Sequence, residues 1–254
     1  MKAMIFAAGL GTRLRPLTDD RPKALVEVDG KPLVWHVIQR LRQAGFSDIV
    51  VNVHHFADLL TSYLMNNDFG VRIHISDERN LLLETGGGIR HAAPFFDDGK
   101  PFLVHNVDIF SNADLHLFYL MASTNPHGAT LLVSERPSSR SLLFDRYLRL
   151  RGWINHQTGE TKPPQLQTAD LEPYAFSGIH VFSPELFSEM KSWPERFSII
   201  DFYLSLAASD KVRAVFDKNM KLIDVGKIDN LRQASEFLRT AGSNPLSDQF
   251  PNVP

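Results

Sequence analysis

The chain has 254 residues, of which 43% are hydrophobic and 22% are charged, and its formal net charge is -2. This length and apolar content can bury the core of one large domain, and the small net charge argues against general attraction to nucleic acid or to a membrane surface. The chain contains no cysteine, which excludes disulfides and thiolate metal sites.

Apolar runs alternate with helical patterns through the first half of the chain. Helical patterns occupy residues 31–44, 57–67 and 114–123, and the expected strands are 2–7, 48–53, 71–75, 102–106 and 129–134. Strands and helices that alternate at this spacing form right-handed βαβ units. The pattern therefore predicts an α/β fold with a doubly wound, mainly parallel, Rossmann-like sheet.

The second half of the chain changes character, because short strand patterns follow one another with turn-rich segments between them. We expect a loop at 160–170, and the predicted strands are 142–145, 147–151, 174–182 and 212–216. Helical patterns return at 184–191, 199–208 and 227–240. This half predicts a small β-rich insertion followed by a return to helices.

The loop after the first strand combines glycines with positive charges. Gly9 and Gly11 allow a ligand to approach the backbone closely, and Arg13 and Lys23 add cations. Ligands of open α/β sheets bind outside the carboxyl ends of the strands, so this loop predicts a phosphate-binding site. Segment 9–14 lacks the third glycine of a dinucleotide-binding turn, and no P-loop motif is present.

The spacing of these residues resembles the signature of the sugar-1-phosphate nucleotidyltransferases. That signature reads G-x-G-x-R, then P-x-T, then P-K, and its counterparts here are Gly9, Gly11, Arg13, Pro16, Thr18, Pro22 and Lys23. The resemblance covers most of residues 1–240 and is strongest to single-domain members that act on N-acetylmuramate 1-phosphate or mannose 1-phosphate. It implies transfer of a nucleoside monophosphate from an NTP to a sugar 1-phosphate, with release of pyrophosphate.

The resemblance also implies how the chain is organised. Residues 1–240 would form a single nucleotidyltransferase domain, in which about 1–134 bind the nucleotide and about 135–226 form a β-rich sugar-binding insertion, with a tail at 241–254. The expected NTP is UTP or GTP, the expected compartment is the cytoplasm, and neither nucleic acid nor a membrane is an expected partner. The sequence leaves the sugar, the base and the oligomeric state open.

Two aspartates are candidate ligands for Mg²⁺, which prefers carboxylates together with phosphate oxygens and water. Asp108 comes after the strand pattern at 102–106, and Asp224 ends a short apolar run. Each is also compatible with a helix cap or a turn. The resemblance implies that both hold Mg²⁺, while Lys23 and Arg13 neutralise the phosphates, so these four are the expected catalytic residues.

Val107 stands where the family usually has glycine before the first aspartate. Valine adopts a positive φ only at a cost, so this position could mark a shifted strand end or weakened activity. It supports one alternative, a non-catalytic protein that binds nucleotide sugars on the same fold. A second alternative is a cytidylyltransferase that acts on phosphocholine-like acceptors.

A second glycine cluster, in segment 83–89, precedes a helical pattern and could be a flexible hinge. It is very similar to a segment of the muramate-type enzymes, which implies contacts with nucleotide and sugar. The expected nucleotide-binding residues are Ala8, Gly9, Leu10, Gly11, Thr12, Arg13, Lys23, Asn52, Thr85, Gly86 and Asp108. The expected sugar-binding residues are Glu84, Gly87, Gly88, Lys162, Ser177 and Gly178.

Three of these assignments rest on position. Asn52 ends the second predicted strand, and Gly178 interrupts an apolar strand, which suggests that a ligand approaches the backbone there. Lys162 stands before a proline and matches the lysine of the family's E-K-P element imperfectly. Arg140 is an alternative cation for the sugar phosphate, or part of an exposed turn.

Overall fold

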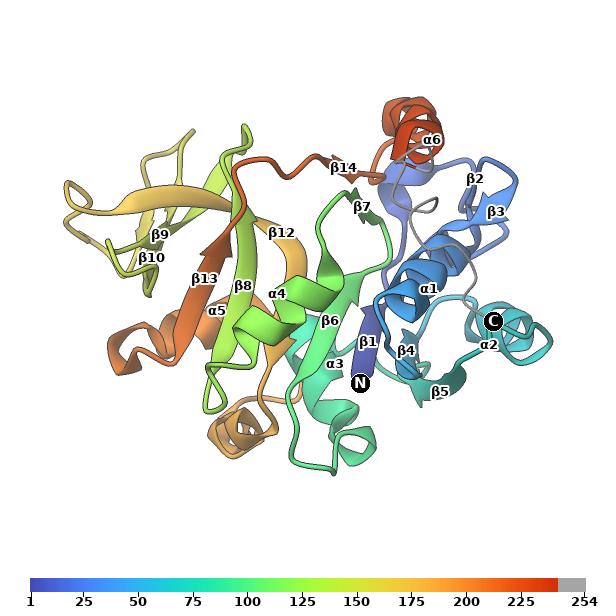
Figure 1. Cartoon of the computed structure of the whole chain (residues 1–254), viewed down its shortest axis with the longest axis horizontal. Coiled ribbons are helices and arrows are strands. Elements are labelled where there is room, and N and C mark those ends of the chain that lie inside the picture. Colours follow the sequence, from blue (N-terminus) through green and yellow to red (C-terminus); the bar gives the residue numbers. More distant parts are fainter. Residues whose placement is uncertain (242–254) are drawn as a thin grey trace, which may run out of the picture.

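The computed structural model describes residues 1–241 and shows a ten-stranded mixed sheet with helices on both faces (Figure 1). The predicted α/β class with a mainly parallel central sheet is confirmed. Of the tail expected at 241–254, the part from residue 242 onward lies outside the described residues.

The parallel part of the sheet consists of four strands in the order β6-β1-β4-β5. These are β1 (Lys2–Phe6), β4 (Asp48–Val53), β5 (Arg72–Asp77) and β6 (Phe102–Asn106). From β1 the chain adds strands first on one side, at β4 and β5, and then on the other, at β6. The strand order therefore reverses between β1 and β6, which is where such sheets bind ligands.

Helices cover both faces of the sheet (Figure 1). One face carries α1 (Leu33–Gln43), α2 (Ala57–Met65), α4 (Leu115–Ala122) and α6 (Asp229–Ala241). The other carries α3 (Glu84–His91) and α5 (Ile199–Ser205). The predicted helical stripe of α1 is confirmed, because the residues that it buries are Leu33, Val34, Val37, Ile38 and Leu41.

The antiparallel part of the sheet joins the parallel part through one long strand, β12 (Glu172–Phe182), which pairs with β6, β8 and β9. The remaining strands are β8 (Ala129–Ser134), β9 (Arg140–Phe144), β10 (Leu150–Asn155), β11 (Thr161–Lys162) and β13 (Val212–Phe216), of which β13 pairs with β8 in parallel. The register of β12 shifts between Phe176 and His180, around Gly178 with φ +77°. This bulge bends the strand where the two parts meet.

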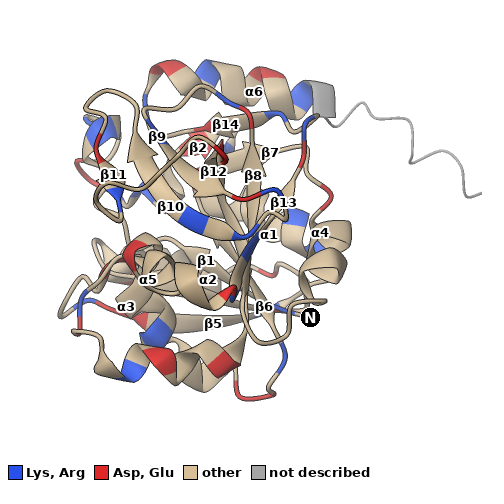
Figure 2. Ribbon diagram, turned by 90° about the vertical axis from the view of Figure 1, so that its left-hand side faces the viewer, with Lys and Arg blue, Asp and Glu red and all other residues tan. Residues whose placement is uncertain are grey.

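Two small ribbons complete the strands. β7 (Ile109–Ser111) pairs with β14 (Leu222–Asp224), and β2 (Glu27–Val28) pairs with β3 (Lys31–Pro32). Acidic and basic residues are interspersed along the ribbon seen in Figure 2, with both signs on α6. No helix among residues 1–241 is long and apolar enough to cross a membrane.

The helix predicted at 184–191 is wrong. Two short 3-10 helices, Pro184–Phe187 and Glu189–Ser192, take its place. Leu186 and Met190 are both buried and are four residues apart, which produced the helical pattern. Between them the hydroxyl of Ser188 donates to the carbonyl of Glu185 at 2.7 Å, and such a bond competes with the backbone ladder of an α-helix.

Smaller differences concern element boundaries. Residues 31–32 belong to β3, so α1 begins only at Leu33, and the predicted loop at 160–170 contains β11. The helix expected at 199–208 ends at Ser205, and a short 3-10 helix, Ala207–Ser209, follows it. The glycines of the second cluster lie inside α3 and not before it, for a packing reason given below.

Candidate active site

A cavity of about 540 Å³ opens at the point where the strand order reverses. Its walls come from the loop after β1, the end of β4, the start of α3 and residues 106–108 after β6. Of the residues predicted to bind nucleotide, this cavity brings together Ala8, Gly9, Leu10, Gly11, Thr12, Arg13, Lys23, Asn52, Thr85 and Asp108.

The loop after β1 is held in a tight turn by contacts that need glycine. Gly11 has φ +66°, and a Cβ there would lie 3.0 Å from Thr18 Cγ2 and 3.1 Å from Lys23 Cβ. The Thr18 hydroxyl donates to the Gly11 carbonyl at 2.9 Å, and the Leu14 N–H donates to the same oxygen at 2.9 Å. The turn therefore carries Arg13 to the wall of the cavity.

Asn52 holds the start of this loop in place. Its side-chain oxygen accepts from the N–H groups of Ala7 at 2.7 Å and Ala8 at 3.3 Å, and its amide nitrogen donates to Glu78 Oε1 at 2.8 Å. Since both ends of the amide have protein partners, Asn52 supports the loop after β1.

Glu78 was missed by the sequence reasoning, although it follows a strand as Asp108 does. Its carboxylate lines the cavity, is only 3% exposed and accepts from Asn52 and from the Leu83 N–H at 3.4 Å. Burial raises the pKa of Glu78, while the hydrogen bonds from Asn52 and Leu83 act in the opposite direction.

Lys23 and Asp108 form an ion pair in the wall of the cavity. Their side chains are 11% and 16% exposed, so water screens the pair only partly. A lysine ammonium has three donors, which lets Lys23 bind a phosphate oxygen while it keeps its bond to Asp108 Oδ2.

Asp224 lies next to Asp108 because β14 pairs with β7. The Val225 N–H donates to the Asp108 carbonyl at 2.8 Å, and a Cβ at Gly226 would lie 2.7 Å from Asp224 Oδ1 and 2.8 Å from Arg13 Nη2. Because Gly226 has no side chain, the Arg13 guanidinium and the Asp224 carboxylate both have room beside it.

The chemistry of this acidic pair suits Mg²⁺. Asp224 Oδ1 is buried and has no hydrogen-bond partner among the described residues. Residues 1–241 contain no group of three or more His, Cys, Asp or Glu side chains that could hold a metal ion. Two carboxylates next to a phosphate-binding loop match a cation that takes few protein ligands and completes its shell with phosphate oxygens and water.

Val107 fits its position without backbone strain. It is 4% exposed, its N–H donates to the Phe6 carbonyl at 3.1 Å, and it is not among the described residues with positive φ. The backbone before Asp108 therefore does not require glycine here.

The second glycine cluster packs α3 against its neighbours. A Cβ at Gly86 would lie 2.4 Å from two ring carbons of Phe197, and one at Gly87 would lie 2.5 Å from the Glu195 carbonyl oxygen. At Gly88 the nearest atom would be Glu78 Oε1, at 2.9 Å. The three glycines are buried and do not line the cavity. Close packing therefore explains them, and no direct contact with a ligand is needed.

The first residues of α3 line the cavity and also contact the segment before α5. Glu84 has φ +62° and accepts from Arg196 Nε at 2.8 Å. The Thr85 hydroxyl oxygen accepts from the Ile199 N–H at 2.9 Å, which leaves its proton available to a ligand. These bonds connect the nucleotide side of the sheet to α5.

The three remaining residues predicted to bind sugar lie elsewhere. Lys162 lines a second cavity of about 320 Å³, which shares Ser198 with the first. Ser177 and Gly178 line neither cavity, and a Cβ at Gly178 would lie 2.7 Å from Asn106 Nδ2. The close approach expected at this glycine is thus made by Asn106, a cavity residue that the sequence reasoning missed.

A buried histidine lies between the two cavities. The ring of His180 contacts Phe6 of the first cavity, with centroids 6.5 Å apart, and Phe176 of the second, with centroids 5.6 Å apart. Burial and the nearby His105 lower the pKa of His180 to about 3. His180 is therefore neutral at physiological pH, and its ring packs between a residue of each cavity.

The fold and the site together define an α/β protein with a cavity at the reversal point of its sheet, where cationic loop residues lie close to two carboxylates. The family model described as Nucleotidyl transferase matches residues 2–241. The chain belongs to this family and is a nucleotidyltransferase.

Two curated relatives align with this chain over most of their own length. The chain is 37% identical over 222 residues to the N-acetylmuramate alpha-1-phosphate uridylyltransferase of Caulobacter vibrioides, which covers 84% of this chain and 87% of the relative. It is 38% identical over 201 residues to the protein of the same name from Neisseria meningitidis serogroup B, covering 76% and 79%.

A solved structure shows the same fold. The structure described as a putative glucose-1-phosphate thymidylyltransferase from Bacillus anthracis, in complex with a sucrose, matches with a TM-score of 0.76. The match covers 94% of this chain and 95% of the other at 19% identity, which establishes the shared fold alone.

Proposed function

We propose that the protein transfers a uridylyl group from UTP to N-acetylmuramate 1-phosphate, giving UDP-N-acetylmuramate and pyrophosphate with the help of Mg²⁺. The observation that carries the proposal is the convergence of Arg13, Lys23 and Asp108 on one cavity, with Asp224 beside it. The choice of substrates is supported by two N-acetylmuramate alpha-1-phosphate uridylyltransferases, which are 37% and 38% identical to the chain.

The reaction is an in-line substitution at the α-phosphorus of UTP. An oxygen of the acceptor phosphate forms the new P–O bond as the bond to pyrophosphate breaks. This oxygen is already anionic, so no general base has to remove a proton. Positioning and electrostatic stabilisation therefore supply most of the rate enhancement.

Each charged residue has a defined part in this scheme. Lys23, fixed by Asp108, faces the cavity where it would neutralise the α-phosphate or the attacking phosphate. Arg13, held beside Asp224 by the room at Gly226, would bind the oxygens of the leaving pyrophosphate.

Asp108 and Asp224 would hold Mg²⁺, with Asp224 Oδ1 as a buried oxygen that lacks another partner among the described residues. When bound, the cation neutralises charge on the phosphates during the transfer. The two carboxylates come from β14 and the turn before β7, so the pairing of these two strands sets their relative position.

The proposal is tested by pyrophosphate release with Mg²⁺. UTP, GTP, CTP, dTTP and ATP are each offered with N-acetylmuramate, glucose and mannose 1-phosphates and with phosphocholine. We expect the highest kcat/KM for UTP with N-acetylmuramate 1-phosphate. A faster reaction with another pair would correct the substrates, whereas nucleotide-sugar binding without release from any pair would indicate a non-catalytic protein.

The variant Asp108→Asn tests the site itself. Loss of one preorganised charged group is expected to lower kcat by roughly 100- to 1,000-fold, the range seen for single electrostatic groups in active sites. Asp19→Asn is the matched control, because Asp19 is exposed on the loop after β1 and lines no part of the cavity. Unchanged turnover in Asp108→Asn would contradict the assigned role.

A further inference from the structure

The second cavity is built from segments of the insertion and from α5. Its walls come from β9, β10, β11, β12 and α5 and from the segment before β9. Ser198, at the start of α5, borders both cavities, so a ligand seated in the first can extend into the second.

The charges in this cavity are unbalanced. Arg136, Arg140 and Lys162 line it together with one acidic residue, Asp201. Lys162 Nζ lies 3.0 Å from Asp201 Oδ1, so these two charges neutralise each other. Three positive charges against one negative leave a net charge of two positive, contributed by the two arginines.

Both arginines keep donors that no residue from 1 to 241 uses. Arg136 donates through Nη2 to the Phe176 carbonyl at 3.1 Å, while its Nε is buried without a partner. The guanidinium of Arg140 makes no ion pair or side-chain hydrogen bond in this part of the chain, and its contact is with the ring of Trp153, 6.0 Å from the centroid. Two guanidinium groups with free donors suit a planar anion.

The reacting phosphate does not account for these charges. It must lie in the first cavity, where Lys23 and Asp108 are placed. Trp153 lines the same cavity, and its ring is contacted by Arg140 and by Lys162, whose Nζ lies 5.4 Å from the ring centroid. The second cavity is thus suited to the far end of an acceptor that carries a further anionic group.

We propose that Arg140, assisted by Arg136, binds a carboxylate on the acceptor sugar and so selects acceptors that carry one. This inference rests on the function proposed above, because N-acetylmuramate carries a lactyl carboxylate that N-acetylglucosamine lacks. A pair of hydrogen bonds from a guanidinium to a carboxylate favours the acceptor that carries this group, since an acceptor without it forms neither bond.

The test compares two acceptors that share the phosphate and the amide, N-acetylmuramate 1-phosphate and N-acetylglucosamine 1-phosphate. In Arg140→Gln, kcat/KM for the first acceptor should fall by about 10- to 100-fold, as expected for loss of a hydrogen bond between charged groups. The value for the second should stay within about twofold, since only the carboxylate contact is lost. Arg140→Lys should lose less, because it keeps the charge.

Arg146→Gln is the matched control, since Arg146 is exposed on the neighbouring turn and stacks on Tyr147 outside the cavity. It should leave both acceptors unchanged. An equal loss on both acceptors in Arg140→Gln would overturn the inference, because Arg140 would then hold the phosphate. An unchanged preference of this variant for N-acetylmuramate 1-phosphate would also overturn the inference. If the wild-type protein turns over neither acceptor, the proposed function itself fails and this inference fails with it.

Discussion

At the residue scale, Gly86 shows how one absent side chain can set the packing of a helix. A Cβ at this position would lie 2.4 Å from ring carbons of Phe197 and 3.0 Å from its carbonyl oxygen. Neither the ring, which packs in the core, nor the backbone can move away without disturbing α5. Close packing against Phe197 therefore explains this glycine, and a flexible hinge is not needed to explain it.

Gly86→Ala should lower the free energy of unfolding by roughly 1–3 kcal/mol, the usual cost of overpacking a core. Urea denaturation followed by circular dichroism measures this change. Gly9→Ala is the control for stability, because nothing lies within 4 Å of its Cβ position and its φ is not positive. If both variants unfold at the same urea concentration, the packing argument at Gly86 is wrong.

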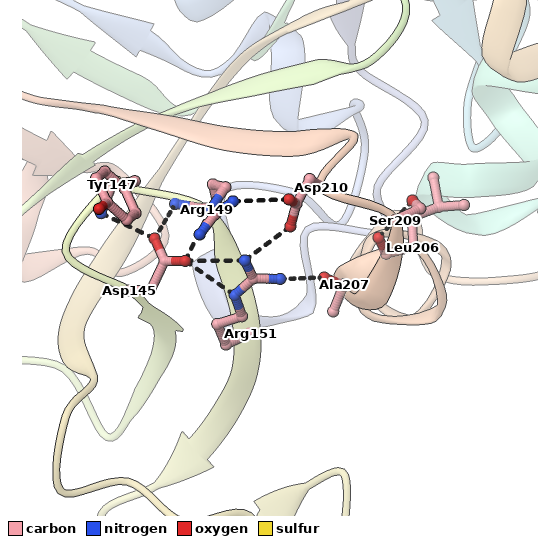
Figure 3. A network of polar contacts seen from close by, with 8 residues as sticks. All are labelled: Asp145, Tyr147, Arg149, Arg151, Leu206, Ala207, Ser209 and Asp210. Atoms are coloured by element: carbon pink, nitrogen blue, oxygen red, sulfur yellow. Dashed lines mark hydrogen bonds and ion pairs between the residues drawn. The ribbon is translucent and has the colours of Figure 1, made fainter.

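At the element scale, an ion-pair network fastens the β9–β10 hairpin to the segment that leads into β13 (Figure 3). Asp145 accepts from the N–H groups of Tyr147 at 2.9 Å and Arg149 at 3.0 Å, and it pairs with Arg151 at 2.8 Å. Arg149 and Arg151 in turn both pair with Asp210, at 2.8 and 2.7 Å. The hairpin that carries Trp153 is thus anchored at its turn.

Asp145 makes the stability of this element depend on pH. Burial opposes its ionisation, but hydrogen bonds from the Arg149 N–H, Arg151 and the Tyr147 N–H outweigh burial and hold its pKa at about 2, against a usual 3.8. Because the pKa is lowered on folding, the stabilisation is complete above about pH 4 and is lost as the pH falls towards 2. By linkage it amounts to about 2 kcal/mol.

Asp145→Asn should therefore be less stable than the wild-type protein by about 2 kcal/mol at neutral pH. The difference should shrink between pH 4 and pH 2, as the wild-type carboxylate becomes protonated. Chemical denaturation over this pH range measures it, with Asp170→Asn, at an exposed position, as the control. A difference that stays constant down to pH 2 would contradict the role given to the ionised carboxylate.

At the scale of the whole molecule, one sheet carries both cavities, and β12 and α5 connect them. The proposed product, UDP-N-acetylmuramate, would occupy both, whereas UTP would occupy only the first. Binding to the folded state alone stabilises a protein by about 2.7 kcal/mol when the ligand is at 100 times its Kd. The increase in Tm that the product causes should therefore depend on residues of both cavities.

Trp153→Ala separates the two contributions, because Trp153 lines only the second cavity. In thermal unfolding, this variant should lose at least half of the increase in Tm caused by UDP-N-acetylmuramate, yet keep the increase caused by UTP with Mg²⁺. The response to UTP also shows that the variant is folded. An unchanged increase in Tm with both ligands would mean that the product does not reach the second cavity.

The parallel half of the fold and the cationic loop after β1 could be predicted from the sequence alone. Strands such as β1 and β4 are short apolar runs, and α1 is an amphipathic stripe, so their patterns are local and readable. The spacing of glycines and cations in residues 9–23 is likewise local. Six of the residues that line the first cavity, Gly9 to Arg13 and Lys23, were predicted from this segment.

The tertiary structure alone decided which distant side chains meet. Asn52 binds Glu78 across neighbouring strands, the pairing of β14 with β7 brings Asp224 beside Asp108, and Gly86 packs on Phe197. The second cavity likewise gathers Arg140, Trp153 and Asp201 from separate elements. Such contacts depend on strand order and register, which arise from packing the whole chain and leave no local pattern in the sequence.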